Sequence, residues 1–314
     1  MLSRVAETIY WIGRYHERAE NIARLIKVNT NLTLDLPQGI MPHWDPLITI
    51  LGCEALYFER HPEITERRVV NFLISDETNP TSILAALGSA RENARTIRDI
   101  LPREGWEIIN AAYNDALESK ADSYSRAGRQ RYLDRIMSSL EHITGLLAGT
   151  MNHDMAYDFL NLGRKIERAD MTTRIIDVRS DFTPPEELPK LRPFEDTVWM
   201  SILKSLSALQ MYRQSMQVRI NRKDVLKFLF CDHLFPRSVA YCVHNIEHYL
   251  SHMPIPRKYK CGEHLEKLHE LLDVPISQEM DNPTLHDYID QIQLQLGELH
   301  NDISKSYFPP SQPA

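Results

Sequence analysis

Glycine is scarce in this sequence, at 11 of 314 residues. Long stretches lack both glycine and proline, which favours helices over hairpins and sheets. The four cysteines form no CxxC pair and have no cysteine–histidine metal spacing. We therefore expect reduced, mostly buried thiols in a cytoplasmic protein.

Several functional motifs are also missing. There is no GxGxxG or GxxxxGK[ST] phosphate loop, so a nucleotide-dependent reaction would need a separate protein to hold the nucleotide. No apolar run approaches the roughly 18 residues of a membrane span, and the charged residues spread through residues 1–27 do not fit a secretion signal. With a net charge of −7 and no basic tail, nucleic acid is not an expected partner.

The sequence does contain an internal repeat. Residues 12–20, IGRYHERAE, return as LGRKIERAD at residues 162–170, an offset of 150. Further matches follow in the same order at offsets of 155 and 156: Trp44 and Tyr57 with Trp199 and Tyr212, and five positions of residues 72–82 with residues 228–238. Matches in one order near one offset predict duplication of a unit of about 155 residues.

Apolar residues at helical spacing predict six helices in each half and no convincing strand. The expected ranges are about 2–28, 44–60, 64–74, 80–100, 103–119 and 128–149, then 153–178, 194–220, 223–230, 236–251, 259–272 and 284–304. The predicted fold class is therefore all-α, an internally duplicated bundle with about six helices per repeat.

The repeat divides the chain into a first unit at 1–151 and a second unit at 152–305. A tail at 306–314 is expected to be disordered. The two units could be separate domains or one fused bundle. Because long helices need wide apolar partners, we expect the units to pack face to face about a pseudo-twofold axis, with the first helix of each unit near that axis.

The first helix of each repeat carries matched charges on one face. These charges are Arg14, Glu17 and Arg18, which return as Arg164, Glu167 and Arg168. One interpretation is structural: each glutamate binds an arginine of the other repeat, in buried pairs that fix the geometry at a high desolvation cost. Gly13 and Gly163 would then allow the two helices to approach closely.

The second interpretation is a binding site. The four arginines would bring permanent positive charge to one cleft, where guanidinium groups suit carboxylate or phosphate. Glu17 and Glu167 would orient an amine or act as a catalytic acid or base. Arg91 and Arg95, one helical turn apart, are further anion-binding candidates, although a charged helix face is their simpler explanation. No metal is expected, because neither repeat has the Glu-x-x-His of di-iron bundles.

Four stretches of the chain resemble the bacterial alpha-E domain family. They are MLSRVAE at the start, WIGRYHERAE from Trp11, ARENAR from Ala90 and FPRSV from Phe235. The resemblance covers about residues 1–305. It implies an all-helical fold named for a Glu-Arg motif, which falls here on Glu17-Arg18 and Glu167-Arg168.

The resemblance also implies partners. Family members are usually encoded beside an ATP-grasp protein of circularly permuted type and a transglutaminase-like protein, a combination that looks like amide-bond synthesis and removal. We therefore expect an accessory or catalytic partner of an ATP-grasp amide ligase that binds a carboxylate or peptide, with ATP and Mg²⁺ held by the ligase and no cofactor in this chain. The alternative is a non-catalytic helical scaffold in which the Glu-Arg pairs only lock the two repeats together.

Overall fold

The computed structural model describes residues 3–35, 44–180, 195–216, 219–254, 261–274, 276 and 281–308, and every regular element in them is helical. The first half contains α1 (Ser3–Asp35), α2 (Asp45–Ile50), α3 (Glu54–Phe58), α4 (Glu66–Ile74), α5 (Ile83–Thr96), α6 (Arg103–Glu118), the 3-10 helix η1 (Lys120–Tyr124) and α7 (Arg126–Thr150). The second half contains α8 (Met155–Ser180), α9 (Glu195–Ser205), α10 (Leu209–Ser215), α11 (Arg222–Cys231), α12 (Val239–Ser251), α13 (Cys261–Leu272) and α14 (Asn282–Tyr307). The all-α prediction is confirmed, and none of these helices is long and apolar enough to cross a bilayer.

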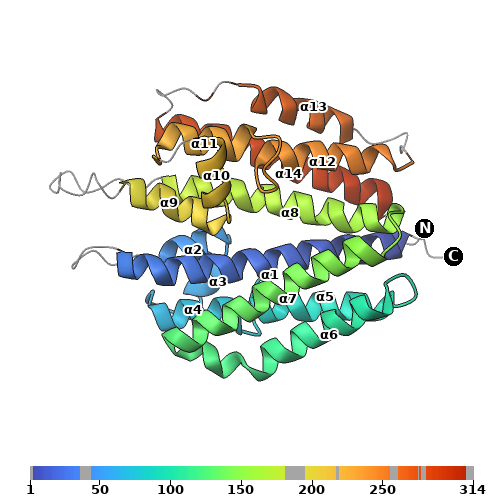
Figure 1. Ribbon diagram of the computed structural model, residues 1–314, viewed down its shortest axis with the longest axis horizontal. Coiled ribbons are helices and arrows are strands. Elements are labelled where there is room, and N and C mark those ends of the chain that lie inside the picture. Colours follow the sequence, from blue (N-terminus) through green and yellow to red (C-terminus); the bar gives the residue numbers. More distant parts are fainter. Residues whose placement is uncertain are drawn as a thin grey trace.

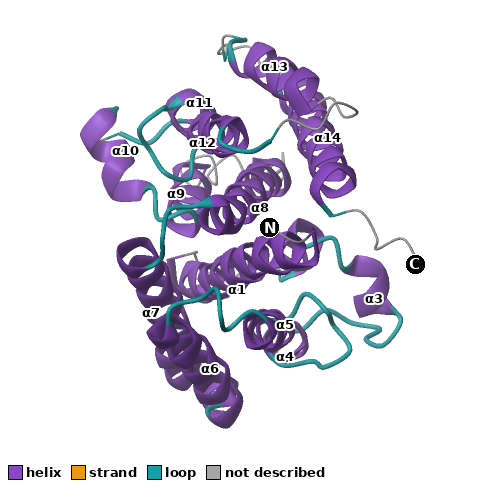
Figure 2. Ribbon diagram, turned by 90° about the vertical axis from the view of Figure 1, so that its right-hand side faces the viewer, coloured by secondary structure: helices purple, strands orange, loops and turns teal. Residues whose placement is uncertain are grey.

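Two long helices, α1 and α8, lie side by side at the centre of the molecule and run in the same direction (Figure 1). The helices α4 to α7 lie on one side of this pair, and α9 to α14 lie on the other (Figure 1; Figure 2). Within each half the first helix is covered in the corresponding way, α1 by α5 and α7, and α8 by α12 and α14. The repeated charged stripe therefore lies inside the bundle, where the two halves meet.

Local contacts recur between the halves. The Tyr57 hydroxyl donates to the carbonyl oxygen of Glu63 over 3.0 Å, and the Tyr212 hydroxyl donates to that of Arg219 over 3.1 Å. The helices also follow one another in the same order in both halves. These correspondences favour an internal duplication. The division of the chain into units at 1–151 and 152–305 stays a prediction.

One expected helix in each half is broken in two. The range 44–60 holds α2 and α3, with Gly52 between them at φ +61°. The range 194–220 holds α9 and α10, with Ser207 between them at φ +52°. A residue in the left-handed region cannot continue a right-handed helix. The described part of each half therefore contains seven α-helices, where the periodicity predicts about six.

The end of the chain also differs from the expectation of a disordered tail at 306–314. Helix α14 continues to Tyr307, and the ring of Phe308 packs with its centroid 5.3 Å from that of Tyr10 and 5.8 Å from that of Phe159. Burial of an aromatic ring in this way holds the chain in place. Residues 309–314 lie outside the described residues.

Two glycines let α1 and α8 approach closely. A Cβ atom on Gly13 would lie 2.0 Å from the carbonyl oxygen of Leu160, and a Cβ atom on Gly163 would lie 2.1 Å from that of Tyr10. No side chain fits at either position, so the two backbones touch. The contacts are reciprocal, as a pseudo-twofold axis running along the two helices would make them.

Candidate ligand site at the interface of α1 and α8

Glu167 on α8 binds two arginines of α1. Arg14 donates from Nε to Oε2 over 2.7 Å, and Arg18 donates from Nε to Oε1 over 2.6 Å and from Nη2 to Oε2 over 3.0 Å. Burial alone would raise the pKa of Glu167, but the two guanidinium groups outweigh burial and lower it. We call these three residues the Glu167 cluster, and its carboxylate is ionised.

Glu17 on α1 makes the reciprocal contacts, and its side chain is completely buried. Arg168 of α8 donates from Nε over 2.9 Å and from Nη2 over 2.6 Å, while the Nε atom of Arg164 lies 4.0 Å from Oε2. Arg237 adds a donor from Nη1 over 2.7 Å. Burial would raise the pKa of Glu17, yet Arg168 and Arg237 lower it well below its ordinary value.

Arg237 comes from the turn before α12 and reaches across α8 to α1. Its Nη2 donates to Glu20 over 2.5 Å, and its Nη1 also donates to Asn21 over 3.0 Å. Thr172 of α8 holds the turn by donating its hydroxyl to the Arg237 carbonyl over 3.0 Å. Glu20 in turn binds Arg24, one helical turn further along α1. The Glu17 cluster thus consists of Glu17, Glu20, Arg24, Arg164, Arg168 and Arg237.

The Glu17 cluster carries more positive than negative charge. Its four guanidinium groups face two carboxylates. Burial, reinforced by the charges of Arg24 and Arg168, lowers the pKa of Arg237 to about 10. Burial and Arg168 likewise lower the pKa of neighbouring Lys165 to about 8. Uncompensated charge is costly inside a protein, so a further anion near these groups would lower the cost of this cluster.

The chain can be placed among known proteins by its sequence. Residues 1–308 match the Alpha-E family, described as a predicted alpha-helical domain with a conserved ER motif. The chain belongs to the Alpha-E family. Curated relatives of this Alpha-E chain are uncharacterised proteins of Mycobacterium bovis and of two strains of Mycobacterium tuberculosis, each 22% identical over 277 residues. The match covers 80% of this chain but only 30% of each relative. No solved structure matches it.

The Glu-Arg motif of this Alpha-E chain forms its ion pairs between helices. Glu17 and Arg18 are neighbours on α1, but Glu17 binds Arg168 of α8 and Arg18 binds Glu167 of α8. Consecutive helix residues point about 100° apart, so each member of the motif meets a different partner. This cross-pairing is the arrangement that the structural interpretation of the stripe expects.

The two glutamates lack the features of a catalytic acid or base. Both carboxylates are buried and accept several guanidinium hydrogen bonds, and the pKa of each lies below its ordinary value. An efficient general base has a pKa near the working pH and reaches its substrate directly. The geometry of Glu17 and Glu167 therefore favours the structural role over the catalytic one.

The four arginines of the repeated stripe divide between the two clusters and do not meet in one cleft. Arg91 and Arg95 lie elsewhere, on α5. Arg91 donates to Asn110 of α6 over 2.7 Å, and both arginines bind Glu92 on the surface. The structure thus does not bring Arg91 or Arg95 to either cluster, and a charged helix face accounts for them.

Sequence reasoning missed three members of the Glu17 cluster. Arg237 lies within the FPRSV stretch. The corresponding residue of the first half is a threonine, Thr81, so Arg237 is not part of the repeated pattern. Glu20 and Arg24 had a usable signal, because a Glu four residues before an Arg on one helix face commonly forms an ion pair.

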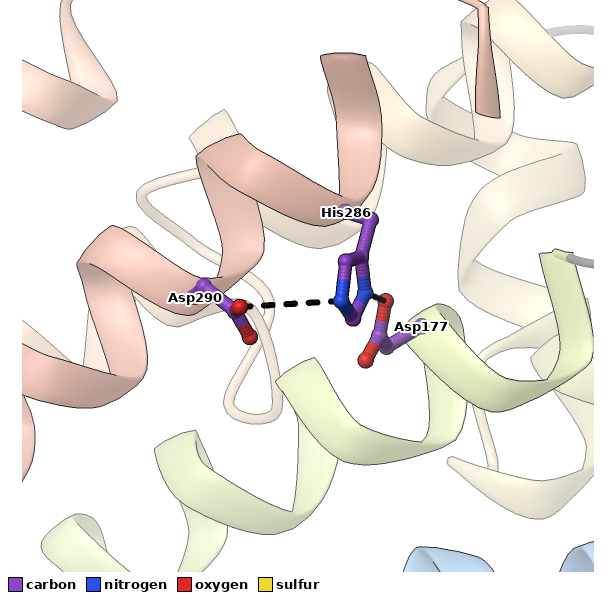
Figure 3. A group of neighbouring side chains, drawn as sticks. All are labelled: Asp177, His286 and Asp290. Carbon is purple, nitrogen blue, oxygen red and sulfur yellow. Dashed lines mark hydrogen bonds and ion pairs between the residues drawn. The ribbon is translucent and has the colours of Figure 1, made fainter. Parts of the chain in front are cut away.

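His286, Asp290 and Asp177 form a separate group where the start of α14 meets the end of α8 (Figure 3). The Nδ1 atom of His286 lies 2.8 Å from an Asp177 oxygen, and Nε2 lies 3.6 Å from an Asp290 oxygen. The ligand atoms are close enough to share one metal ion. However, each ring nitrogen faces one carboxylate, so polar contacts between the imidazole and the two carboxylates explain the same geometry without a metal ion. His286 and Asp290 are also both exposed.

Proposed function

We propose that this Alpha-E chain is an accessory partner of an ATP-grasp amide ligase, and that it binds the carboxylate or peptide substrate of the ligase at the interface of α1 and α8. The observation that carries the proposal is the excess of guanidinium groups over carboxylates in the Glu17 cluster. Arginine binds carboxylate and phosphate groups through two parallel hydrogen bonds. An acidic substrate would supply the missing negative charge.

In this proposal the ligase holds ATP and Mg²⁺, and this chain holds no cofactor. The lengths of the mycobacterial relatives support a partnership, because the region similar to this chain makes up only 30% of each of them. A region similar to this chain is therefore joined there to a much longer polypeptide. A transglutaminase-like protein is the second proposed partner, and the cytoplasm is the proposed location.

The alternative function is a non-catalytic scaffold. The complete burial of the Glu17 side chain, with three arginines around it, supports this alternative. In a scaffold the two clusters would only lock the halves of the chain in one relative position, and any ligand would bind to the ligase alone.

The test is reconstitution with the ATP-grasp protein that the family resemblance leads us to expect beside this chain, measured as ADP release with acidic amino acids or peptides as substrates. Arg164→Gln removes one charge of the surplus without removing a short hydrogen bond to Glu17. We expect it to lower the rate about tenfold, because the cluster would then attract an acidic substrate with one positive charge fewer. Arg95→Gln on the surface of α5 is the matched control and should leave the rate unchanged. Equal rates for both variants, with ligase activity that needs this chain, would favour the scaffold.

A further inference from the structure

A pocket of about 450 Å³ lies between α1, α7 and the turn that joins α9 to α10. Its volume is in the range of pockets that bind small molecules. The polar and charged residues that line it include Arg24, Lys27, Glu141, Lys204, Ser207 and Gln210. The pocket thus brings side chains from both halves of the chain together at one opening.

Ser207 gives the wall of this pocket an unusual backbone. It is the one residue other than glycine, within the described part of the chain, that has a positive φ, and the corresponding residue of the first half is Gly52. An L-residue in this region is strained compared with the right-handed region, because its Cβ lies too close to the following carbonyl oxygen. Such strain is concentrated at functional sites. Ser207 is exposed and places a hydroxyl group where glycine would leave none.

Arg24 connects the pocket with the Glu17 cluster. It binds Glu20, and Glu20 also binds Arg237, which reaches Glu17. Lys27 is balanced by Asp134, with Nζ 2.5 Å from Oδ1, and the pocket also holds Lys204 and Glu141, which are opposite in charge. The unbalanced positive charge therefore belongs to the cluster, and Arg24 is the member of the cluster that lines an open pocket.

A second cavity at the cluster is too small for a ligand. It adjoins Arg164 and His16 and has a volume of about 10 Å³, which is room for about one water molecule. Burial and the charge of Arg164 lower the pKa of His16 to about 3, so this imidazole is neutral and adds no charge. A ligand larger than water can approach the surplus charge from the pocket at Arg24.

We propose that the pocket at Arg24 binds a small acidic amino acid or the acidic end of a short peptide. A carboxylate of the ligand would face Arg24 and Lys204, and its ammonium group would face Glu141. The hydroxyl group of Ser207 and the amide of Gln210 would hydrogen-bond the remaining polar atoms. This inference rests on the proposed function for the role of the ligand, as the substrate of the ligase, and it gives that substrate a place on this chain.

The test is isothermal titration calorimetry of the full chain with L-glutamate, and with L-glutamine as the ligand that lacks the second carboxylate. We expect one saturable site for glutamate and binding of glutamine at least about tenfold weaker. Gln210→Trp, which fills the pocket from an exposed position, should abolish binding, while Met211→Trp beside it should not. Lys204→Gln should weaken binding about tenfold, while Lys227→Gln, at an exposed position of α11, should not.

Two results would overturn the inference. One is the absence of saturable glutamate binding up to about 10 mM, a concentration at which even a weak site fills. The other is glutamate binding that persists in Gln210→Trp but is lost in Arg164→Gln. That result would place the ligand site in another part of the cluster, and it would still be consistent with the proposed function. If glutamate binds the pocket but Gln210→Trp leaves the reconstituted ligase fully active, the pocket is a glutamate site and the proposed function is wrong.

Discussion

Replacing Glu17 with glutamine removes one negative charge and keeps the size of the side chain. The Glu17 side chain is completely buried and accepts hydrogen bonds from Arg168 over 2.6 and 2.9 Å and from Arg237 over 2.7 Å. Only Glu20 would remain to balance the cluster. Breaking a buried ion pair by removing one partner costs about 3–5 kcal/mol, because the other charge stays buried and uncompensated.

The same change at Glu167 should cost less. Glu167 meets two arginines, whose side chains are 11% and 19% exposed, whereas Arg168 and Arg237 around Glu17 are each 9% exposed. Water can therefore solvate part of the charge that Glu167→Gln would leave unpaired. We expect the free energy of unfolding to fall by about 3–5 kcal/mol for Glu17→Gln and by less for Glu167→Gln.

The assay is urea denaturation followed by circular dichroism at neutral pH, extrapolated linearly to water. Glu104→Gln, at an exposed position of α6, is the control for the substitution itself. The double variant Glu17→Gln with Arg237→Met should be more stable than the sum of the two single effects predicts, because it removes a charge of each sign from one network. A loss below about 1 kcal/mol for Glu17→Gln, as at a surface pair, would refute the assignment of a buried, strongly coupled ion pair.

Three further predictions concern glycine contacts, backbone strain and pH. Gly13→Ala should destabilise the fold by about 3 kcal/mol or more, because its Cβ would lie 2.0 Å from the Leu160 carbonyl oxygen. Gly145→Ala on α7, where a Cβ would meet no atom within 4 Å, should stabilise the fold by up to about 1 kcal/mol. Equal effects of the two substitutions in thermal denaturation would contradict the close contact at Gly13. Ser207→Gly should raise the free energy of unfolding by about 0.5–1 kcal/mol, since relief of the positive φ exceeds the extra entropy of glycine, and a lower melting temperature would argue against strain. His16 has a pKa of about 3 in the folded chain, below its ordinary value near 6.5. As the pH falls below about 6.5, the unfolded chain therefore binds a proton that the folded chain does not, and the fold becomes less stable. The free energy of unfolding should fall by about 2 kcal/mol from pH 7 to pH 5. His16→Ile, which copies Ile166 of the second repeat, should remove that part of the slope in urea denaturation at pH 5, 6 and 7. An unchanged slope would show that folding does not shift the pKa of His16.

Much of the fold could be predicted from the sequence, because helix periodicity and a repeat are local signals. The ranges near 64–74, 103–119 and 236–251 correspond to α4, α6 and α12 within a few residues. The breaks at Gly52 and Ser207 could not be predicted, since each depends on one backbone angle inside an otherwise helical pattern. Helix boundaries at such points are set by tertiary packing and not by periodicity.

The candidate site was predictable only in part. The repeat identified Glu17 and Glu167, and the close approach expected at Gly13 and Gly163 is present. The repeat could not reveal Arg237, because a contact between residues 220 positions apart leaves no spacing pattern in one sequence. The division of the arginines into two clusters was also hidden, since helical periodicity places side chains on a face but does not place that face against a partner.

The position of α1 at the centre of the bundle has a consequence for synthesis on the ribosome. The partner of its charged face, α8, lies 150 residues later in the chain, and at about 5–20 residues per second it emerges roughly 8–30 s after α1. During that interval a face lined with leucine would expose an aggregation-prone stripe. A face that carries Arg14, Glu17 and Arg18 stays well hydrated during this interval. The same charges that are costly to bury in the folded protein therefore keep the nascent chain soluble until α8 has been synthesised.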